Sequence, residues 1–188
     1  MKRLIVPQRL LAAMILAVVA IAIPGVAHAG PAEIAVPTDV AVVDGYKLFL
    51  VAHAVGVQIH ECVPNGSGYR WRFVGPRADL YDDTGKLVAT HFAGPGWQAR
   101  DGSKVTATLD GNGSVTVDPT AIPWLRLRVT SASAGADGDR LAGTKYIQRL
   151  ETTGGLAPAA ATCNAETLGT LAEVPYTADY AFWKATGS

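Results

Sequence analysis

The stretch VTATLDGNG, residues 105–113, decides the fold, because apolar and polar side chains alternate in it up to a glycine-rich turn. In a strand, successive side chains point to opposite faces, so Val105, Ala107 and Leu109 would share one face and the threonines the other. Asp, Asn and Gly accept the backbone angles of tight hairpin turns, which places a turn at Asp110–Gly113. The stretch predicts an antiparallel strand with one buried face and one solvent face.

The same alternation recurs along the chain between turn residues such as Asp82–Gly85 and Asp101–Gly102. In two further segments, 69–73 and 124–129, one face is expected in the core and the other in water. The side chains expected to face the core are those of Tyr69, Trp71, Phe73, Leu125, Leu127 and Val129. The chain is therefore predicted to be all-β, either an antiparallel β-sandwich or a closed β-barrel.

Two segments depart from simple alternation. The run Tyr46–Cys62 is more apolar on both faces than its neighbours, which predicts a central strand, and Gly56 within it predicts a bulge or a break into two strands. The segment Asn164–Glu173 is expected to form one short helix, with Asn164 as its cap and Gly169 as a weak point.

The amino end predicts export from the cytosol. Lys2, Arg3 and Arg9 precede an apolar run, Leu10–Ile23, that is followed by Ala27-His28-Ala29. A charged start, a short apolar run and an Ala-x-Ala site are typical of a signal peptide. We therefore expect a signal peptide at residues 1–29, a single all-β domain at 30–188 and a secreted or extracytoplasmic location, with no integral membrane span after signal removal.

The charge balance favours no polyanionic partner. Removing the signal takes away three basic residues and no acidic ones, so 16 basic against 16 acidic residues becomes 13 against 16, a net charge of −3. A basic surface is the usual footprint of nucleic-acid binding, so no nucleic-acid partner is predicted. The expected partner is an extracellular ligand or an envelope component that the sequence leaves unidentified.

Cys62 and Cys163 are the only two cysteines of the chain. In an exported protein, two lone cysteines predict an intramolecular disulfide. The alternative, a redox-active pair, lacks the Cys-x-x-Cys spacing of such sites.

Several segments together resemble a domain family of unknown function found in secreted bacterial and fungal proteins. The pattern that carries the resemblance is GVQIxxC at 56–62, HxAGPxW at 91–97 and VPYTADY at 174–180. His60 stands where the family pattern is expected to place tyrosine. The resemblance implies a secreted domain and names no activity, so no catalytic residue follows from it.

His91 and Trp97 flank the turn Gly94-Pro95-Gly96, and two interpretations stay open. In the first, Trp97 plugs the core and His91 is hydrogen-bonded to a loop carbonyl. In the second, the turn presents both side chains to a ligand, since loops on a rigid sheet often carry binding residues. Gln58, in the first of the family-like segments, joins this candidate ligand-binding set.

Two arginine pairs add a second candidate surface. Arg70 and Arg72 lie on one strand face, and Arg126 and Arg128 share another face with Trp124. If the two strands were neighbours, they would form a basic, aromatic-flanked patch for a carboxylate or a sulfated sugar. The alternative is a solvated face paired with acids. Arg72 and Trp124 complete the set of candidate ligand-binding residues.

The sequence predicts no cofactor and no native metal site. His53 and His60 differ by seven positions, which puts them on opposite faces of a regular strand, and His60 is expected at the surface. Ser103 lacks a Gly-x-Ser-x-Gly context. We therefore expect a non-catalytic domain that binds a carbohydrate, a small molecule or a protein partner. The alternative is a small secreted enzyme, metal-dependent or hydrolytic, centred on His91.

Overall fold

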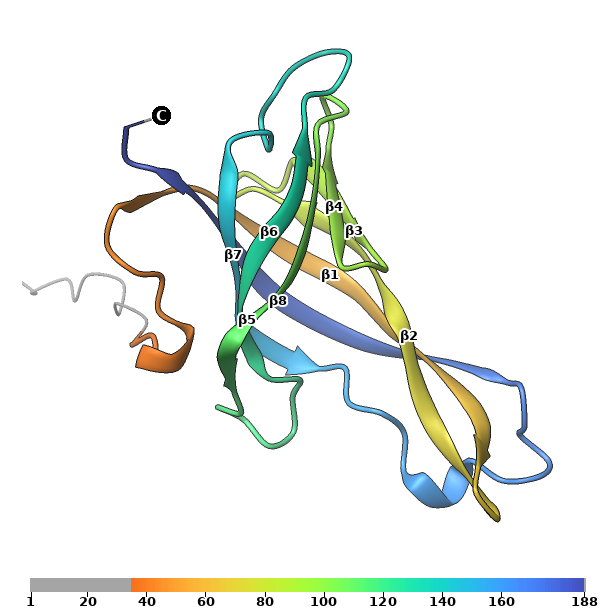
Figure 1. Cartoon of the computed structure of the whole chain (residues 1–188). Coiled ribbons are helices and arrows are strands. Elements are labelled where there is room, and N and C mark those ends of the chain that lie inside the picture. Colours follow the sequence, from red (N-terminus) through yellow and green to blue (C-terminus); the bar gives the residue numbers. More distant parts are fainter. Residues whose placement is uncertain (1–34, 188) are drawn as a thin grey trace, which may run out of the picture. The chain divides into compact units, whose positions relative to one another are not determined.

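The computed structural model describes residues 35–187, and the expected signal peptide lies outside the described residues. Eight antiparallel strands follow one another, each paired with its neighbour in sequence, and β8 also pairs with β1 and so closes the sheet (Figure 1). The strands are β1 (Tyr46–Asn65), β2 (Gly68–Tyr81), β3 (Leu87–Phe92), β4 (Gly96–Ala99), β5 (Lys104–Val115), β6 (Trp124–Ser133), β7 (Thr144–Gly154) and β8 (Leu171–Ala185). The all-β prediction is confirmed, and of its two forms the structure has the closed sheet.

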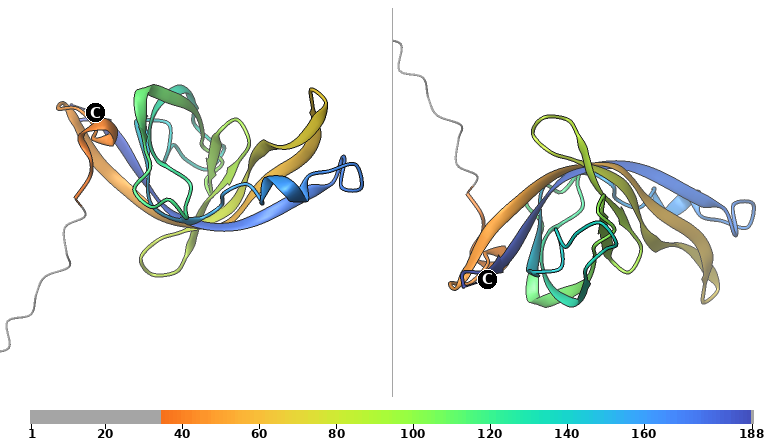
Figure 2. Two further views of the ribbon diagram at one scale, coloured as in Figure 1. Left: turned by 90° about the horizontal axis from the view of Figure 1, so that it is seen from below. Right: turned by 90° about the horizontal axis from the view of Figure 1, so that it is seen from above.

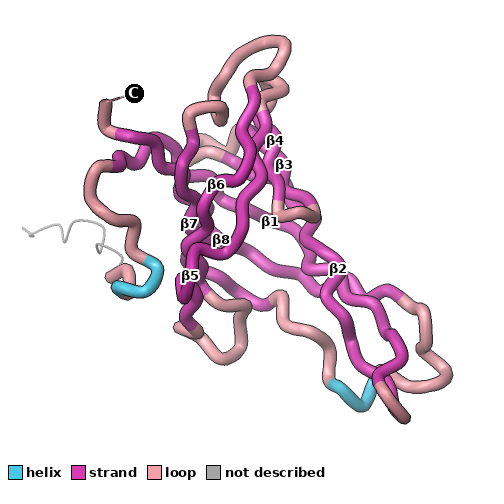
Figure 3. Tube along the Cα trace, viewed as in Figure 1, coloured by secondary structure: helices cyan, strands magenta, loops and turns pink. Residues whose placement is uncertain are grey.

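The strands are too unequal to make a regular barrel. β1 has 20 residues and β8 has 15, whereas β3 has six and β4 has four. Beyond a register shift between Ile59 and His60, β1 and β2 continue as a hairpin that leaves the barrel (Figure 2). We call residues 60–73 of this hairpin the arm. The connection from β7 to β8, which contains the single helical turn η2 (Ala160–Thr162), runs towards the arm (Figure 3).

The arm explains one wrong prediction. The aromatic side chains at 69–73 were expected in the core, but Phe73 is 54% exposed and Tyr69 is also exposed. Trp71 is half-buried, and its indole N–H donates to the Thr162 hydroxyl at 3.1 Å. Alternation predicts that residues share a face, and the face is buried only where another element covers it.

The hydrophobic core lies inside the barrel. Trp97, Tyr180, Phe182, Leu80 and Ile147 are among its largest fully buried side chains. The core-facing predictions are confirmed for the buried side chains Val105, Ala107 and Leu127, whereas Leu125 and Val129 are partly buried and pack against the core.

The stretch 105–113 is a strand, but it does not end in a hairpin turn. β5 continues to Val115, and its pairing with β6 jumps from Leu109 to Ser114. Residues 110–113 are therefore an excursion within one strand. Leu109 borders this excursion and is exposed, contrary to the prediction.

A smaller cluster covers the outside of the barrel. The helical turn η1 (Thr38–Val40) packs Val40 against Trp124 and Leu150. The backbone carbonyl of Val40 accepts a hydrogen bond from the buried Gln148 amide at 2.6 Å. Trp124 was expected on a solvent face and is buried, because the segment before β1 folds over that face.

β1 passes through Gly56 without a bulge or a break, so that prediction is wrong. The pairing of β1 with both β2 and β8 is in register there. A Cβ at Gly56 would lie 2.2 Å from the Arg77 carbonyl oxygen and 2.5 Å from the Ala78 Cβ. Glycine is present because two backbones approach closely.

The helix expected at 164–173 is also absent. The side-chain oxygen of Asn164 accepts the backbone N–H groups of Glu166 and Thr167, which makes a turn. Such local bonds from side chain to backbone compete with helix formation. Leu171 already begins β8.

The disulfide is confirmed between Cys62 and Cys163, whose Cα atoms are 5.4 Å apart. It joins the arm to the β7–β8 connection. Backbone bonds support the same junction, because the Cys62 N–H donates to the Thr170 carbonyl and its own carbonyl accepts the Gly169 N–H. None of the helices among the described residues has the length and apolar character needed to cross a membrane.

Gly56→Ala is expected to destabilise the protein by about 2 kcal/mol, because the added methyl overpacks the contact with Arg77 and Ala78. Gly68→Ala is the matched control, since the nearest atom to its added Cβ would be 3.8 Å away. Urea unfolding of both variants checks this, and equal stability of the two would contradict the close approach.

Reduction of the disulfide is expected to lower the free energy of unfolding by up to about 5 kcal/mol, the loop-closure value for roughly 100 residues. The double variant Cys62→Ser, Cys163→Ser should have the same unfolding free energy as the reduced protein, and added reductant should not change it. Unfolding curves with and without reductant provide the test. Wild-type curves that coincide would mean that the bond contributes nothing.

Candidate functional site

A pocket of about 290 Å³ opens inside the barrel, beside the base of the arm. Seven of the eight strands, or the turns next to them, contribute to its wall. The lining residues are Gln58, Phe73, Val74, Gly75, Pro76, His91, Gly94, Pro95, Trp97, Leu125, Leu127, Arg149 and Tyr180. Phe73 and Val74 are exposed and mark the mouth, whereas Trp97 and Tyr180 are buried and form the inner wall.

Strand register places the key side chains next to one another. His91 on β3 is directly opposite Trp97 on β4. Arg149 on β7 is directly opposite Leu125 on β6 and Tyr180 on β8. Residues directly opposite in an antiparallel pair share a face, so each row points into the barrel together.

His91, Trp97 and Tyr180 form an aromatic wall. The His91 ring stacks on the Trp97 ring with centroids 4.3 Å apart, and Tyr180 meets the His91 ring edge-on at 4.9 Å. His91 Nδ1 lies 2.8 Å from the Gly96 carbonyl oxygen, so Nδ1 carries the proton and donates it to that oxygen. Burial lowers the pKa of His91 to about 3, and the imidazole is neutral at physiological pH.

Arg149 is the cation of the pocket. Its Nε and Nη2 both donate to the Pro123 carbonyl oxygen, at 3.0 and 2.8 Å. The hydroxyls of Tyr180 and Tyr176 lie close enough to interact electrostatically with it. Burial lowers the pKa of Arg149 and raises that of both tyrosines, so the tyrosines stay neutral. No carboxylate within residues 35–187 forms an ion pair with Arg149.

Buried donors without partners lie around the same space. The side-chain N–H groups of Gln58 Nε2 and Trp97 Nε1 have no hydrogen-bond acceptor among the described residues. Gln58 is 2% exposed and Trp97 is 0% exposed. A second hollow of about 230 Å³ adjoins the pocket and shares Gln58, Phe73 and Arg149 with it. Leaving a buried donor unsatisfied costs about 1–3 kcal/mol, so these donors mark a place for a polar partner.

The structure brings three of the five candidate ligand-binding residues together, namely Gln58, His91 and Trp97. Both interpretations of the Gly-Pro-Gly turn describe part of what is observed. Trp97 is in the core and His91 is bonded to a loop carbonyl, yet both side chains also line the pocket.

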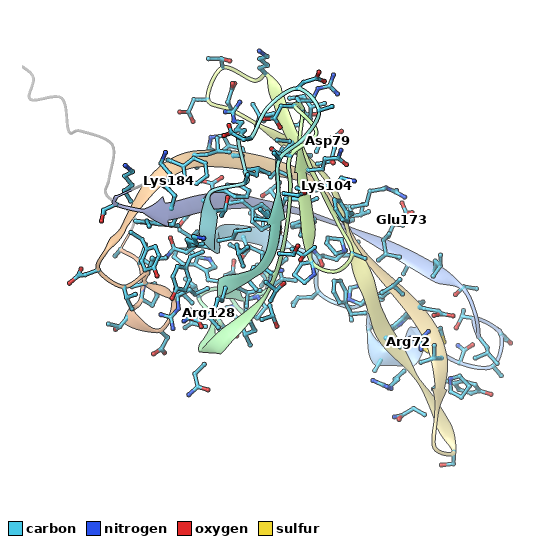
Figure 4. The ribbon with its side chains drawn as sticks, turned by 45° about the horizontal axis from the view of Figure 1, so that its top comes forward. Arg72, Asp79, Lys104, Arg128, Glu173 and Lys184 are labelled. Atoms are coloured by element: carbon cyan, nitrogen blue, oxygen red, sulfur yellow. A yellow bond between two sulfur atoms is a disulfide. The ribbon has the colours of Figure 1, made fainter. Side chains whose placement is uncertain are left out.

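The other two candidates lie elsewhere. Arg72 is on the arm and forms an ion pair with Glu61 (Figure 4). Trp124 packs in the outer cluster. The two arginine strands are not neighbours, because β3, β4 and β5 lie between β2 and β6. The expected basic patch therefore does not form.

The second arginine pair is occupied by an acid. Arg126 and Arg128 each donate through Nε to the Asp110 carboxylate at 2.9 Å. Arg128 also lies over the Tyr146 ring, 4.9 Å from its centroid. This arrangement is the alternative interpretation, a sheet face paired with an acid.

Sequence reasoning missed Arg149 and Tyr180. β7 is buried on both faces, because the barrel covers one face and η1 the other, so alternation could not select Arg149. The available signal was position within the family-like segments, since Tyr180 ends the VPYTADY match at 174–180.

His53 and His60 lie on opposite faces of β1. His60 was expected at the surface and is instead buried, with its ring centroid 5.5 Å from that of Phe73. His53 contacts Asp179 through Nδ1 at 2.7 Å and Asp83 through Nε2 at 2.8 Å. Within the described part of the chain, no three His, Cys, Asp or Glu residues are grouped to hold a metal ion.

Among residues 35–187, the His91 side chain is bonded to the Gly96 carbonyl and to no acid or nucleophile, which does not favour the enzyme alternative. The Ser103 hydroxyl donates to Asp101 at 2.6 Å and accepts the Leu141 N–H. General bases work best with a pKa near the working pH, and the pKa of His91 is about 3. The pocket is suited to holding a molecule between apolar walls and a fixed cation.

The three histidines of the described chain should titrate differently in NMR spectra. The pKa of His53 is raised by Asp83 and Asp179, that of His60 is lowered by burial, and His91 should stay neutral above about pH 4. Because His91 accepts a proton near pH 6.5 only when unfolded, its contribution to stability is complete above pH 6.5 and is lost as pH falls towards 3.

The unfolding free energy should therefore fall with decreasing pH, by as much as about 1.4 kcal/mol per pH unit from His91 alone. His91→Gln should flatten this dependence. An imidazole of His91 that titrates near pH 6.5 in the folded protein would contradict its burial.

Comparison with known proteins identifies a family and no activity. A family model described as "Protein of unknown function (DUF3455)" matches residues 43–184. Neither the curated proteins nor the solved structures contain a match to this chain. The matched residues include all eight strands apart from the last residue of β8, and they contain the whole pocket. Because the match covers well over half of the sequence, the chain belongs to this family of proteins of unknown function.

Proposed function

We propose that this protein is a non-catalytic, extracytoplasmic binding domain that holds a small organic molecule in the barrel pocket. The observation that carries the proposal is the pocket of about 290 Å³ whose wall includes two buried donors without partners. Small-molecule sites are concave and mostly apolar, with a few polar groups that fix orientation. The pocket has this composition.

A small molecule fits the pocket better than the two other classes of ligand. A carbohydrate presents many hydroxyl groups that need polar partners, whereas most of the residues that line this pocket are apolar. A protein partner needs a contact surface of roughly 800 Å² on each side. The exposed part of the pocket is the mouth at Phe73 and Val74, and the other lining residues lie inside the barrel. The volume lies near the lower end of the range for small-molecule pockets.

Two observations support the location. The disulfide between Cys62 and Cys163 is of the kind that persists in oxidising compartments. The amino-terminal sequence has the order of a signal peptide, with a charged start before Leu10–Ile23 and an Ala-x-Ala site after it.

The neutral fluorescent probe N-phenyl-1-naphthylamine should bind the secreted protein saturably and with one site, with enhanced emission because the pocket is apolar. Leu125→Trp replaces an aliphatic side chain of the pocket wall with a larger indole ring, which should fill the pocket and abolish this binding. Leu109→Trp is the matched control, because Leu109 is 46% exposed and does not line the pocket.

A fluorescence titration of the three proteins decides the matter. Equal binding by wild type and Leu125→Trp would place the probe elsewhere. Absence of saturable binding by wild type would contradict the proposed function.

A further inference from the structure

We propose that the pocket selects molecules that carry a carboxylate, which binds the Arg149 guanidinium and the Gln58 amide while its apolar body lies against the His91–Trp97 stack. This inference rests on the proposed function and names the class of ligand. It follows from the charge of the pocket, its unpaired donors and the nature of its walls.

The charge of Arg149 has no counterion in the described protein. Arg126 offers the comparison, because its Nε donates to the Asp110 carboxylate. Arg149 is held by the Pro123 carbonyl instead, which uses two of its five N–H donors, and it also hydrogen-bonds to the neutral Tyr180 hydroxyl; neither partner supplies a negative charge. Cations that are withdrawn from water are normally paired, and Arg149 is partly buried, so a partner of opposite charge is expected from outside the chain.

Gln58 supplies the second contact. Its Nε2 is buried and has no acceptor among residues 35–187, and its side chain borders both the pocket and the adjoining hollow that contain Arg149. A carboxylate has about four lone-pair sites and can accept from a guanidinium and an amide at once. One ligand group can therefore satisfy both residues.

The charge count favours a carboxylate over a phosphate. Arg149 is the only lysine or arginine in the pocket wall, and the neighbouring His91 is neutral because burial lowers its pKa to about 3. A monoanion balances one cation in an apolar site, whereas a dianionic phosphate would keep an unbalanced charge.

The apolar body of the ligand is defined by the remaining wall. The stacked His91 and Trp97 rings lie on one side, and Leu125 and Leu127 contribute aliphatic surface from β6. Stacking and burial against such surfaces favour a flat or chain-like hydrocarbon group. A compact aryl-alkyl acid combines the two features.

The test compares 4-phenylbutyrate with its neutral amide, 4-phenylbutanamide, as competitors of N-phenyl-1-naphthylamine. We expect wild type to bind the acid at least tenfold more tightly than the amide at neutral pH. Arg149→Met should remove this preference while leaving the affinities for the amide and for the fluorescent probe within about twofold, since methionine keeps an unbranched side chain in the pocket wall and lacks the charge. Arg77→Met is the matched control, because Arg77 is outside this pocket and should change neither affinity.

The outcomes separate the two proposals. If wild type binds the acid and the amide equally, or if Arg149→Met keeps the preference, the carboxylate inference is overturned while the proposed function stands. If neither competitor nor the probe binds wild type, both are overturned. Should Arg149→Met fail to fold by circular dichroism, Gln58→Met takes its place and is expected to weaken acid binding several-fold more than amide binding; equal effects would contradict the inference.

Discussion

The guanidinium of Arg149 is the group on which the interior of this barrel depends, because it is a partly buried cation held by a backbone carbonyl instead of by an acid. Its anchor, the Pro123 carbonyl, is itself fixed in place. The adjacent Ile122 donates its N–H to the Gly154 carbonyl, and its own carbonyl accepts the Thr152 hydroxyl. The chain therefore positions a charge in the middle of β7 without neutralising it.

Barrel closure determines what surrounds that charge. Pairing of β8 with both β7 and β1 places Tyr180 beside Arg149 and encloses the aromatic wall. Enclosure excludes water, which keeps His91 uncharged and strengthens interactions with the remaining cation. The uneven strands matter too, since the departure of the arm after Ile59 leaves Phe73 and Val74 at an open mouth.

Local patterns predicted the strands and the disulfide, and tertiary arrangement decided the rest. The alternation at 105–109 predicted a strand, and a lone pair of cysteines predicted the bond between Cys62 and Cys163. Alternation could not say which face is covered. Phe73 is exposed because it lies at the base of the arm, and Trp124 is buried because η1 folds over the barrel.

The candidate site could be predicted from the sequence only where its residues are close together in the chain. His91 and Trp97 are close in sequence, so the Gly-Pro-Gly turn between them indicated that the two side chains lie side by side. Gln58 and Arg149 are about half of the chain apart in sequence, and only closure of the sheet brings them to one pocket. A single arginine in a strand buried on both faces carries no periodic signal that sets it apart.

The most direct measurement of the central claim is the unfolding free energy of Arg149→Met in the absence of ligand. If Arg149 is retained for a ligand, its desolvation is uncompensated in the free protein, and replacement by an unbranched apolar side chain should leave stability unchanged within about 1 kcal/mol or raise it. If Arg149 instead serves the fold through its bonds to Pro123, the same variant should lose about 3 kcal/mol or more, as expected when a structurally required buried partner is removed. That loss would contradict the account.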